Sequence, residues 1–308
     1  MKKVFSPFAA VPADSVSDWR ESGLLREIAR WMAAFPKASA AIDDDCALLE
    51  VSRERRLVTV DSLIYGRHFD DAVEAYWAGR KLLARNLSDI AADGGQPSDA
   101  VLALVMSGDV AKGWLKDFYR GILENCVRYG LRLVGGDVAS VAGTGFFSAT
   151  LTLTGFGGTR VLRRSGARAG DFICVSGTLG GSLKSGRHFR FEPRLALGRL
   201  LAEENLATAC MDLTDGLAKD LPALVPAGTH AELDLAAIPL SAAAEGVGSA
   251  FSDGEDYELL FTVAPENFER LLSRSGDLKI SKIGSIVAGT ASAGTPFGLP
   301  FGGGFEHF

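Results

Sequence analysis

The chain has 308 residues, which favours two domains or one large domain over a single small one. Hydrophobic residues make up 47% and charged residues 23%, so a substantial core can form and intrinsic disorder is excluded for most of the chain. The formal net charge of −6 argues against a nucleic acid or an anionic membrane as a partner bound through bulk charge. It leaves room for local phosphate binding, above all where metal ions bridge phosphate to carboxylates.

Neither the N-terminus nor the cysteines indicate export. Residues 1–12 hold a short apolar stretch that Pro7 and Pro12 interrupt, which argues against a secretory signal. The longest apolar runs, such as residues 101–106, fall far short of the roughly 20 residues that a membrane helix needs. The cysteines stand far apart without a C-x-x-C pair, so we expect reduced thiols in a cytoplasmic protein rather than a zinc site or disulfides. They are Cys46, Cys126, Cys174 and Cys210.

Helices and strands alternate in the first half of the chain. Apolar residues at helical spacing predict helices over residues 23–35, 73–92 and 112–129. Runs of β-favouring residues predict strands over residues 46–51, 57–60, 101–106, 131–134 and 146–156. The strand at 131–134 is expected to end at the glycine pair Gly135-Gly136, with Asp137 directly after it.

A second series of elements follows Gly157-Gly158, which is a suitable place for a domain boundary. Strands are predicted over residues 172–175 and 257–263, a helix over 195–204, and a further helix from near Thr214 to just before Pro226. We therefore predict an α/β (α+β) protein of two domains. The predicted ranges are a leader over 1–20, an N-terminal domain over 21–157 and a C-terminal domain over 158–308.

The aspartates concentrate at predicted strand ends and helix starts. Several carboxylates that converge there repel one another unless cations lie between them, which suggests Mg²⁺ together with phosphate oxygens. Each aspartate alone also has a structural explanation, such as a helix cap for Asp212 or Asp215 and a solvated helix face for Asp89. The inference therefore depends on the joint pattern. Its members are Asp43, Asp44, Asp45, Asp61, Asp89, Asp137, Asp212 and Asp215.

Three familiar functional motifs are absent from the sequence. The glycine-rich stretch Gly177–Ser185 is not a P-loop, because Leu183 stands directly before Lys184 where that motif requires glycine. The histidines have no H-E-x-x-H spacing, and no G-x-S-x-G nucleophile elbow occurs. Covalent hydrolase chemistry therefore has no support.

Eight short segments occur in order along the chain. They are A-I-D-D-D-C-A at 41–47, D-S-L-I-Y-G-R-H-F at 61–69, N-L-S-D-I-A-A at 86–92, G-G-D at 135–137, R-S-G-A at 164–167, D-L-T-D-G-L at 212–217, G-E-D-Y-E-L at 254–259 and H-F at 307–308. Together they resemble the motifs of the thiamine-monophosphate kinase family, in the superfamily named for aminoimidazole-ribonucleotide synthetase. The resemblance spans about residues 20–308. Asp43 departs from it, because it occupies the place of a family glycine.

The resemblance implies a reaction, an assembly and a set of ligands. Members of that family phosphorylate thiamine monophosphate to thiamine diphosphate with ATP and Mg²⁺. They are homodimers whose paired N-terminal domains form a barrel-like sheet core, with each active site in a cleft between domains. Carried over by position, the metal ligands and catalytic carboxylates are Asp45, Asp61, Asp89, Asp137, Asp212 and Asp215, with Thr59 as a further metal ligand. The ATP contacts are Tyr119, Gly136, Asp137, Arg164 and Thr214, and the thiamine contacts are His68, Glu255 and Phe305.

This set of residues suits a direct in-line phosphoryl transfer. A phosphate monoester has its second pKa at about 6, so the accepting oxygen is already anionic and needs no general base. The transfer then requires positioning and neutralisation of two polyanions, which Mg²⁺ and the bidentate donors of Arg164 can supply. The helix expected near Thr214 would offer its N–H groups to a phosphate.

Other members of the superfamily are alternatives to a thiamine-monophosphate kinase. A selenophosphate synthetase would need a reactive cysteine in a mobile N-terminal loop, whereas Cys46 follows three aspartates at a predicted strand start. A hydrogenase-maturation relative would end in cysteine, and this chain ends in Phe308. A purine-pathway synthetase would lack the D-x-L-I-x-G-x-H-F and G-E-D-Y-E-L segments. A non-catalytic metal or nucleotide binder is the alternative from a different class.

Overall fold

The computed structural model describes residues 5–37, 55–289, 299–300 and 302–304. Its contacts divide the chain into two compact units: unit 1 comprises residues 1–87 and 97–156, and unit 2 comprises residues 88–96 and 157–308. Residues 88–96, which the sequence analysis placed in the N-terminal domain, thus group with unit 2. The acidic triplet at 43–45, the strand predicted at 46–51 and Phe305 lie outside the described residues.

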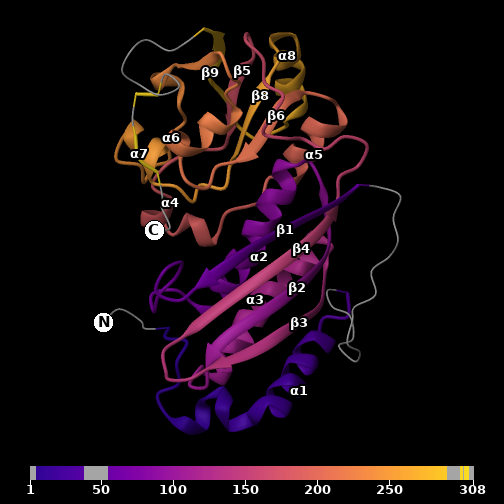
Figure 1. Ribbon diagram of the computed structural model, residues 1–308, viewed down its shortest axis with the longest axis vertical. Helices are drawn as coiled ribbons and strands as arrows, with labels where there is room; N and C mark the ends of the chain where they lie inside the picture. The colour runs from indigo at the N-terminus through magenta and orange to yellow at the C-terminus, as the bar shows by residue number, and fades with distance from the viewer. Residues whose placement is uncertain (1–4, 38–54, 290–298, 301, 305–308) are drawn as a thin grey trace. The chain divides into compact units, whose positions relative to one another are not determined.

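The described residues of unit 1 form a four-stranded sheet with helices against one face (Figure 1). The strands are β1 (Arg56–Ile64), β2 (Gln96–Ser107), β3 (Arg132–Val141) and β4 (Phe147–Phe156), in the order β1-β4-β2-β3. β1 and β4 are antiparallel and β2 and β3 are parallel. The long helices are α1 (Arg20–Ala33), α2 (Ala75–Ala92) and α3 (Lys112–Tyr129), and short 3-10 turns at Pro12–Asp14 and Val16–Trp19 precede α1. The predicted mixed α/β class is confirmed.

Two glycines allow α2 and α3 to cross in close contact. A Cβ atom at Gly79 would lie 2.0 Å from the carbonyl oxygen of Phe118, and one at Gly121 would lie 2.1 Å from that of Tyr76. Any larger residue would push the helices apart. Their inner faces pack on the sheet through fully buried side chains such as Leu83.

Among the described residues of unit 1, no helix covers the other face of the same sheet. Residues of β4 alternate between buried and half-buried, as expected when only one face is covered. On the edge strand β1, Val58 is 71% exposed and Val60 is 59% exposed. Apolar, β-branched side chains exposed in this way suit a surface that a partner covers.

β3 differs from the prediction. The glycine pair was expected to end the strand, but β3 continues through it to Val141. A Cβ atom at Gly136 would lie 2.0 Å from the carbonyl oxygen of Leu102, so glycine here permits close pairing with β2 rather than a turn. Asp137 is therefore in the middle of a strand. Asp61 likewise lies within β1 rather than after it.

Unit 2 is a five-stranded antiparallel sheet with helices on both faces (Figure 1). Its strands are β5 (Phe172–Ser176), β6 (Ala207–Asp212), β7 (Thr229–Leu233), β8 (Leu259–Val263) and β9 (Ile280–Ala288), in the order β6-β8-β5-β9-β7. The helices are α4 (Ser182–Ser185), α5 (Leu195–Glu203), α6 (Leu217–Asp220), α7 (Val247–Ser252) and α8 (Pro265–Arg274), with 3-10 turns at Arg187–Phe189, Leu221–Leu224 and Leu235–Ala237.

Alternate residues of the unit 2 strands enter two separate hydrophobic clusters. Ile173 belongs to the cluster that contains Leu217 of α6, whereas its neighbour Cys174 belongs to the cluster that contains Leu201 of α5. This alternation is what a sheet buried on both faces requires.

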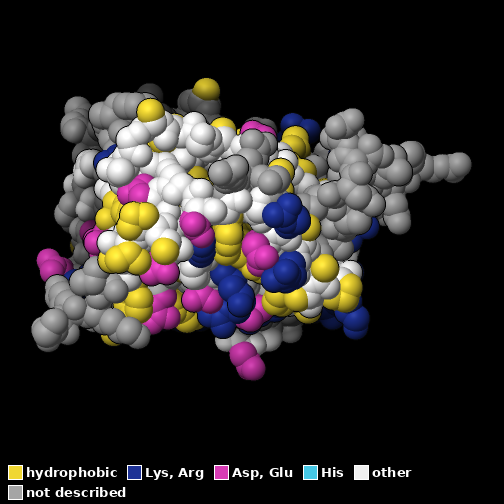
Figure 2. Space-filling view, turned by 90° about the horizontal axis from the view of Figure 1, so that it is seen from below, with side chains coloured by type: hydrophobic (Ala, Val, Ile, Leu, Met, Phe, Trp, Pro, Cys, Tyr) yellow, Lys and Arg dark blue, Asp and Glu magenta, His cyan; other side chains and the backbone are white. Residues whose placement is uncertain are grey.

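In the part of the chain that the structure describes, no helix combines the length and the apolar character that crossing a bilayer demands. On the face drawn in Figure 2, Lys and Arg side chains are interspersed with Asp and Glu side chains.

Candidate active site

Two of the predicted metal ligands in unit 1, Thr59 and Asp61, lie on β1. Both alternate with the exposed valines, so they lie on the face of the sheet that the helices cover. The carboxylate of Asp61 is 2.8 Å from a guanidinium nitrogen of Arg85 on α2. Arg85 also donates a hydrogen bond of 2.8 Å to the carbonyl oxygen of Ser62. Arg85, which belongs to none of the sequence motifs, fixes the carboxylate relative to the helix.

Asp137 lies elsewhere in unit 1. It is exposed on the edge strand β3 and pairs in register with Ala103, which is exposed too. Asp61 lies on the opposite edge strand and on the covered face. One copy of unit 1 therefore does not bring Asp61 and Asp137 together, contrary to the convergence that the sequence suggested.

His68 and Tyr119 occupy different environments in unit 1. His68 lies in the turn after β1, where its Nδ1 accepts a hydrogen bond of 3.0 Å from the N–H of Ile64. In the neutral ring this contact leaves the proton on Nε2. Tyr119 is 4% exposed and its ring packs 5.5 Å from that of Trp31, and burial raises the pKa of its hydroxyl. The assignments of both residues stay predictions.

In unit 2, acidic and basic groups gather at the ends of α2 and β6. Burial and the carboxylate of Asp89 raise the pKa of Asp93, while Arg163 and Arg164 oppose that shift. Asp212 ends β6 and is 3% exposed. The predicted site residues Asp89 and Arg164 thus both lie near Asp93. Asp93 itself was not among the predicted site residues.

Cys210 connects this group to Asp212. Its thiol is buried, and burial together with the charges of Asp212 and Asp93 raises its pKa. Its N–H donates a hydrogen bond of 2.9 Å to the carbonyl oxygen of Arg163, which holds the segment bearing Arg163 and Arg164 alongside β6. Asp212 and Asp93 therefore both lie near the Cys210 thiol.

The donor set has the chemistry of a Mg²⁺ site without forming a complete one among the described residues. Carboxylates that repel one another in a buried setting favour a hard divalent cation. Within the described part of the chain, no three His, Cys, Asp or Glu side chains are arranged to hold a metal ion. Asp45 lies outside that part.

The loop after β6 is built differently from the expectation. The N–H groups of Thr214, Asp215 and Gly216 donate to one carboxylate oxygen of Asp220, at 2.9, 2.9 and 3.1 Å. The expectation of N–H groups available to a phosphate near Thr214 is therefore wrong, because Asp220 already accepts them. The helix itself begins later, at Leu217. Asp215 contacts Lys219 at 2.9 Å.

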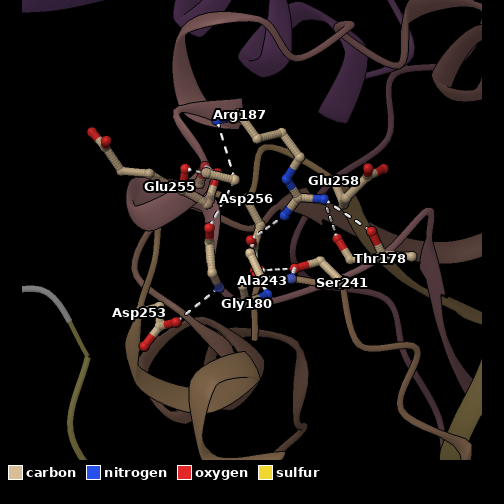
Figure 3. Close-up of polar contacts among 12 residues, drawn as sticks. Thr178, Gly180, Arg187, Ser241, Ala243, Asp253, Glu255, Asp256 and Glu258 are labelled. Carbon is tan, nitrogen blue, oxygen red and sulfur yellow. Dashed lines mark hydrogen bonds and ion pairs between the residues drawn. The ribbon is translucent and has the colours of Figure 1, made fainter. Parts of the chain in front are cut away.

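The predicted substrate residue Glu255 belongs to a network of polar contacts in unit 2 (Figure 3). The N–H of Gly180 donates to both carboxylate oxygens of Asp256, at 3.0 and 2.9 Å, and that of Gly181 donates to Asp253 at 2.8 Å. These N–H groups of the glycine-rich loop thus bind carboxylates of the protein itself, which agrees with the argument against a P-loop. Asp256 also pairs with Arg187.

The partners of this network could not be read from the sequence motifs. Arg187, His188 and Arg194 contact the acidic loop, residues 253–258, from a segment that carries no motif. The available signal was only an excess of basic residues at 187–194.

The comparisons with known proteins cover both units. Residues 43–158 match the family described as AIR synthase related protein, N-terminal domain. Residues 155–295 match the family described as AIR synthase related protein, C-terminal domain. These matches define the class, a two-domain protein of the AIR synthase related kind.

The relatives narrow this class. A thiamine-monophosphate kinase of Rhodopirellula baltica is 34% identical over 295 residues, with 88% of this chain and 92% of the relative covered. The crystal structure of the thiamine-monophosphate kinase from Stenotrophomonas maltophilia K279a has a TM-score of 0.74 and 32% identity, and covers 88% of this chain and 95% of that one. A structure described as AaThiL complexed with AMPPCP and TMP has a TM-score of 0.73 and 28% identity, and covers 95% of this chain and 98% of that one. The chain therefore belongs to the thiamine-monophosphate kinase family, as the motifs indicated.

Proposed function

We propose that this protein transfers the γ-phosphoryl group of ATP to thiamine monophosphate and so forms thiamine diphosphate. The observation that carries the proposal is the gathering of Asp89, Asp93, Asp212 and Arg164 in unit 2, in a chain 34% identical to a thiamine-monophosphate kinase over most of its length. The related AaThiL structure is a complex with AMPPCP and TMP, which supports ATP and thiamine monophosphate as the substrates of this protein.

The residues have distinct roles in this transfer. Arg164 offers paired N–H donors to phosphate oxygens, and the Thr214 hydroxyl offers a further contact. The acceptor phosphate is anionic at neutral pH, so no side chain has to remove a proton. When bound, Mg²⁺ would neutralise charge on the phosphates and help to align them. Its proposed ligands are Asp45, Thr59, Asp61, Asp89, Asp137, Asp212 and Asp215, and Tyr119 and Gly136 complete the proposed ATP contacts. His68, Glu255 and Phe305 are the proposed thiamine contacts.

We further propose that the protein is a homodimer joined through the open face and edges of the unit 1 sheet. Val58 and Val60 give that face an exposed apolar surface, and β1 and β3 are edge strands with one side unpaired within the sheet. A barrel of two such sheets would pair β1 of one copy with β3 of the other. It would thereby bring Asp61 of one copy towards the strand that carries Asp137 in the other. The buried thiols of Cys126, Cys174 and Cys210 suit a cytoplasmic enzyme.

The proposal is tested by assaying the purified protein for thiamine diphosphate with ATP and thiamine monophosphate, with and without Mg²⁺. Asp89→Asn and Asp212→Asn should each lower kcat by about 100-fold or more, because each loses a charge that faces the phosphates. Asp277→Asn, at an exposed position of the same unit, is the matched control. ATP turnover that yields no thiamine diphosphate would instead favour another synthetase of the superfamily, and no nucleotide turnover at all would favour a binding protein.

A further inference from the structure

The backbone of the acidic loop, residues 253–258, is strained. Glu255 and Tyr257 have φ angles of +54° and +52°, in the left-handed region that residues with a Cβ atom rarely adopt. Asp256 lies between them. Such a conformation persists only where the surroundings hold it, and strain of this kind concentrates at functional sites.

A neighbouring segment holds the acidic loop through its charged residues. In this segment, residues 187–194, which we name the clamp segment, Nδ1 of His188 lies 2.6 Å from a carboxylate oxygen of Glu255. Arg187 pairs with Asp256, which is 2% exposed, and donates to the carbonyl oxygen of Thr178 at 2.5 Å (Figure 3). Arg187 thus ties the acidic loop to the glycine-rich loop.

The clamp segment also holds the second half of the acidic loop. Phe191 stacks on Tyr257 with ring centroids 4.1 Å apart and the planes 14° from parallel. Arg194 donates two hydrogen bonds of 2.7 and 2.6 Å to Glu258, which also accepts one of 2.6 Å from Ser176. Each of the residues from Glu255 to Glu258 therefore contacts one residue of the clamp segment.

On its other side the acidic loop bonds to the loop after β6. The N–H of Glu255 donates to the carbonyl oxygen of Thr214 at 2.7 Å, and the N–H of Tyr257 donates to that of Leu213 at 2.8 Å. The N–H of Leu213 donates in turn to the carbonyl oxygen of Glu258 at 2.8 Å. The acidic loop is thus fixed between the clamp segment and a loop that carries proposed ligands of ATP.

From these contacts we propose that His188 and Arg187 are positioning residues, which orient the Glu255 carboxylate towards the cationic ring of the substrate. The inference rests on the proposed function, because thiamine monophosphate supplies that ring. His188 binds one carboxylate oxygen of Glu255, and the other accepts a hydrogen bond of 3.4 Å from the hydroxyl of Tyr257. The Glu255 side chain is 15% exposed, so these two contacts leave little freedom for it to turn.

Steady-state kinetics of His188 variants test the proposal. His188→Ala should raise KM for thiamine monophosphate by about 10-fold or more, with kcat and KM for ATP within about threefold of the wild type. His188→Asn, whose amide nitrogen occupies the place of Nδ1 and can donate to Glu255, should recover most of that loss. Lys184→Ala is the matched control, because its ion pair with Glu245 lies on the surface just before the clamp segment. An equal rise in both KM values, or no rise in either, would overturn the proposal.

A double-mutant cycle separates positioning from a general structural role. In the Glu255→Gln background, adding His188→Ala should change KM for thiamine monophosphate by less than about twofold, because the carboxylate on which His188 acts is already lost. Full additivity of the two changes would refute the positioning role even if both proteins fold.

Hydrogen exchange tests the positioning role independently of the reaction. Arg187→Ala should speed amide exchange at residues 253–258 at least about tenfold, with Arg187→Lys intermediate because lysine cannot span both partners. Unchanged exchange would overturn the role of Arg187. If the wild type forms no thiamine diphosphate, the proposed function fails, while this exchange result still decides whether the clamp segment holds the loop.

Discussion

The carboxylate of Asp61 on β1 is held 2.8 Å from the guanidinium of Arg85 on α2. The side chains are only 20% and 14% exposed, so water screens the pair little. Because Arg85 also binds the carbonyl oxygen of Ser62, the carboxylate has a defined place before any ligand arrives. Arg85 thus orients the carboxylate of Asp61, which is a proposed metal ligand.

Asp61→Asn is expected to lower kcat by about 100-fold or more, and excess Mg²⁺ should not restore it. Asparagine keeps the shape of the side chain but removes the charge that a cation would bind. Arg85→Lys keeps a positive charge beside an intact Asp61 and should retain kcat within about tenfold. The measurement is turnover against Mg²⁺ concentration for the three proteins. Activity of Asp61→Asn within a few-fold of the wild type would remove Asp61 from the proposed ligands.

Local patterns predicted the helices of unit 1 well. Helix α3 has the predicted range 112–129, because its apolar residues keep a helical period and Gly130 ends it in a left-handed conformation with φ of +70°. Unit 2 was harder to predict. β7, β9 and the helix α8 were missed. β7 and α8 contain few apolar residues, and β9 has apolar residues without a regular alternation, so its strand depends on pairing with β5 and β7, which are distant in the sequence.

The candidate site could be predicted as a set of residues but not as an arrangement. The motifs indicated Asp89, Asp212 and Arg164, which do gather in unit 2. They could not reveal that Asp220 takes up the N–H groups near Thr214. Nor could they reveal that Arg187 binds a carboxylate 69 positions further along the chain. Such contacts depend on the folded backbone rather than on spacing in the sequence.

Val60→Glu is expected to weaken or abolish the proposed dimer, because a carboxylate would be buried in an apolar interface between two copies. Val127→Glu is the matched control, since Val127 is 47% exposed on α3 and away from the open face of the sheet. Sedimentation velocity over a range of concentrations gives the molecular mass. A wild type that sediments as a monomer, or a dimer that persists unchanged in Val60→Glu, would contradict this interface.

The stability of unit 2 is expected to fall as the pH rises from about 4 to about 7. Burial raises the pKa of Asp256 to about 7, although the Gly180 N–H and Arg187 act in the opposite direction. Burial also raises the pKa of Asp220 to about 6. Their ordinary value is 3.8, so the folded state binds more protons than the unfolded state in this range. Each group then lowers the free energy of unfolding by up to about 1.4 kcal/mol per pH unit.

Urea unfolding followed by far-UV circular dichroism from pH 4.5 to 7.5 measures this slope. Asp256→Asn should flatten it, because the carboxyl group that binds the additional protons is lost. Tryptophan fluorescence reports unit 1 separately, because all four tryptophans, at 19, 31, 77 and 114, belong to that unit. A slope that Asp256→Asn does not change would show that Asp256 titrates normally in the folded protein.

Gly136→Ala is expected to destabilise unit 1 by about 2–4 kcal/mol and to displace Asp137. The added Cβ atom would lie 2.0 Å from the carbonyl oxygen of Leu102, so β3 would have to move away from β2. Gly135→Ala is the matched control, since its Cβ atom would find Val101 only at 3.9 Å, and it should cost less than about 1 kcal/mol. Urea unfolding followed by tryptophan fluorescence compares the two variants, and kcat shows whether Asp137 has moved. Equal losses of stability in the two variants would contradict the close pairing of β2 and β3 at Gly136, and with it the position assigned to Asp137.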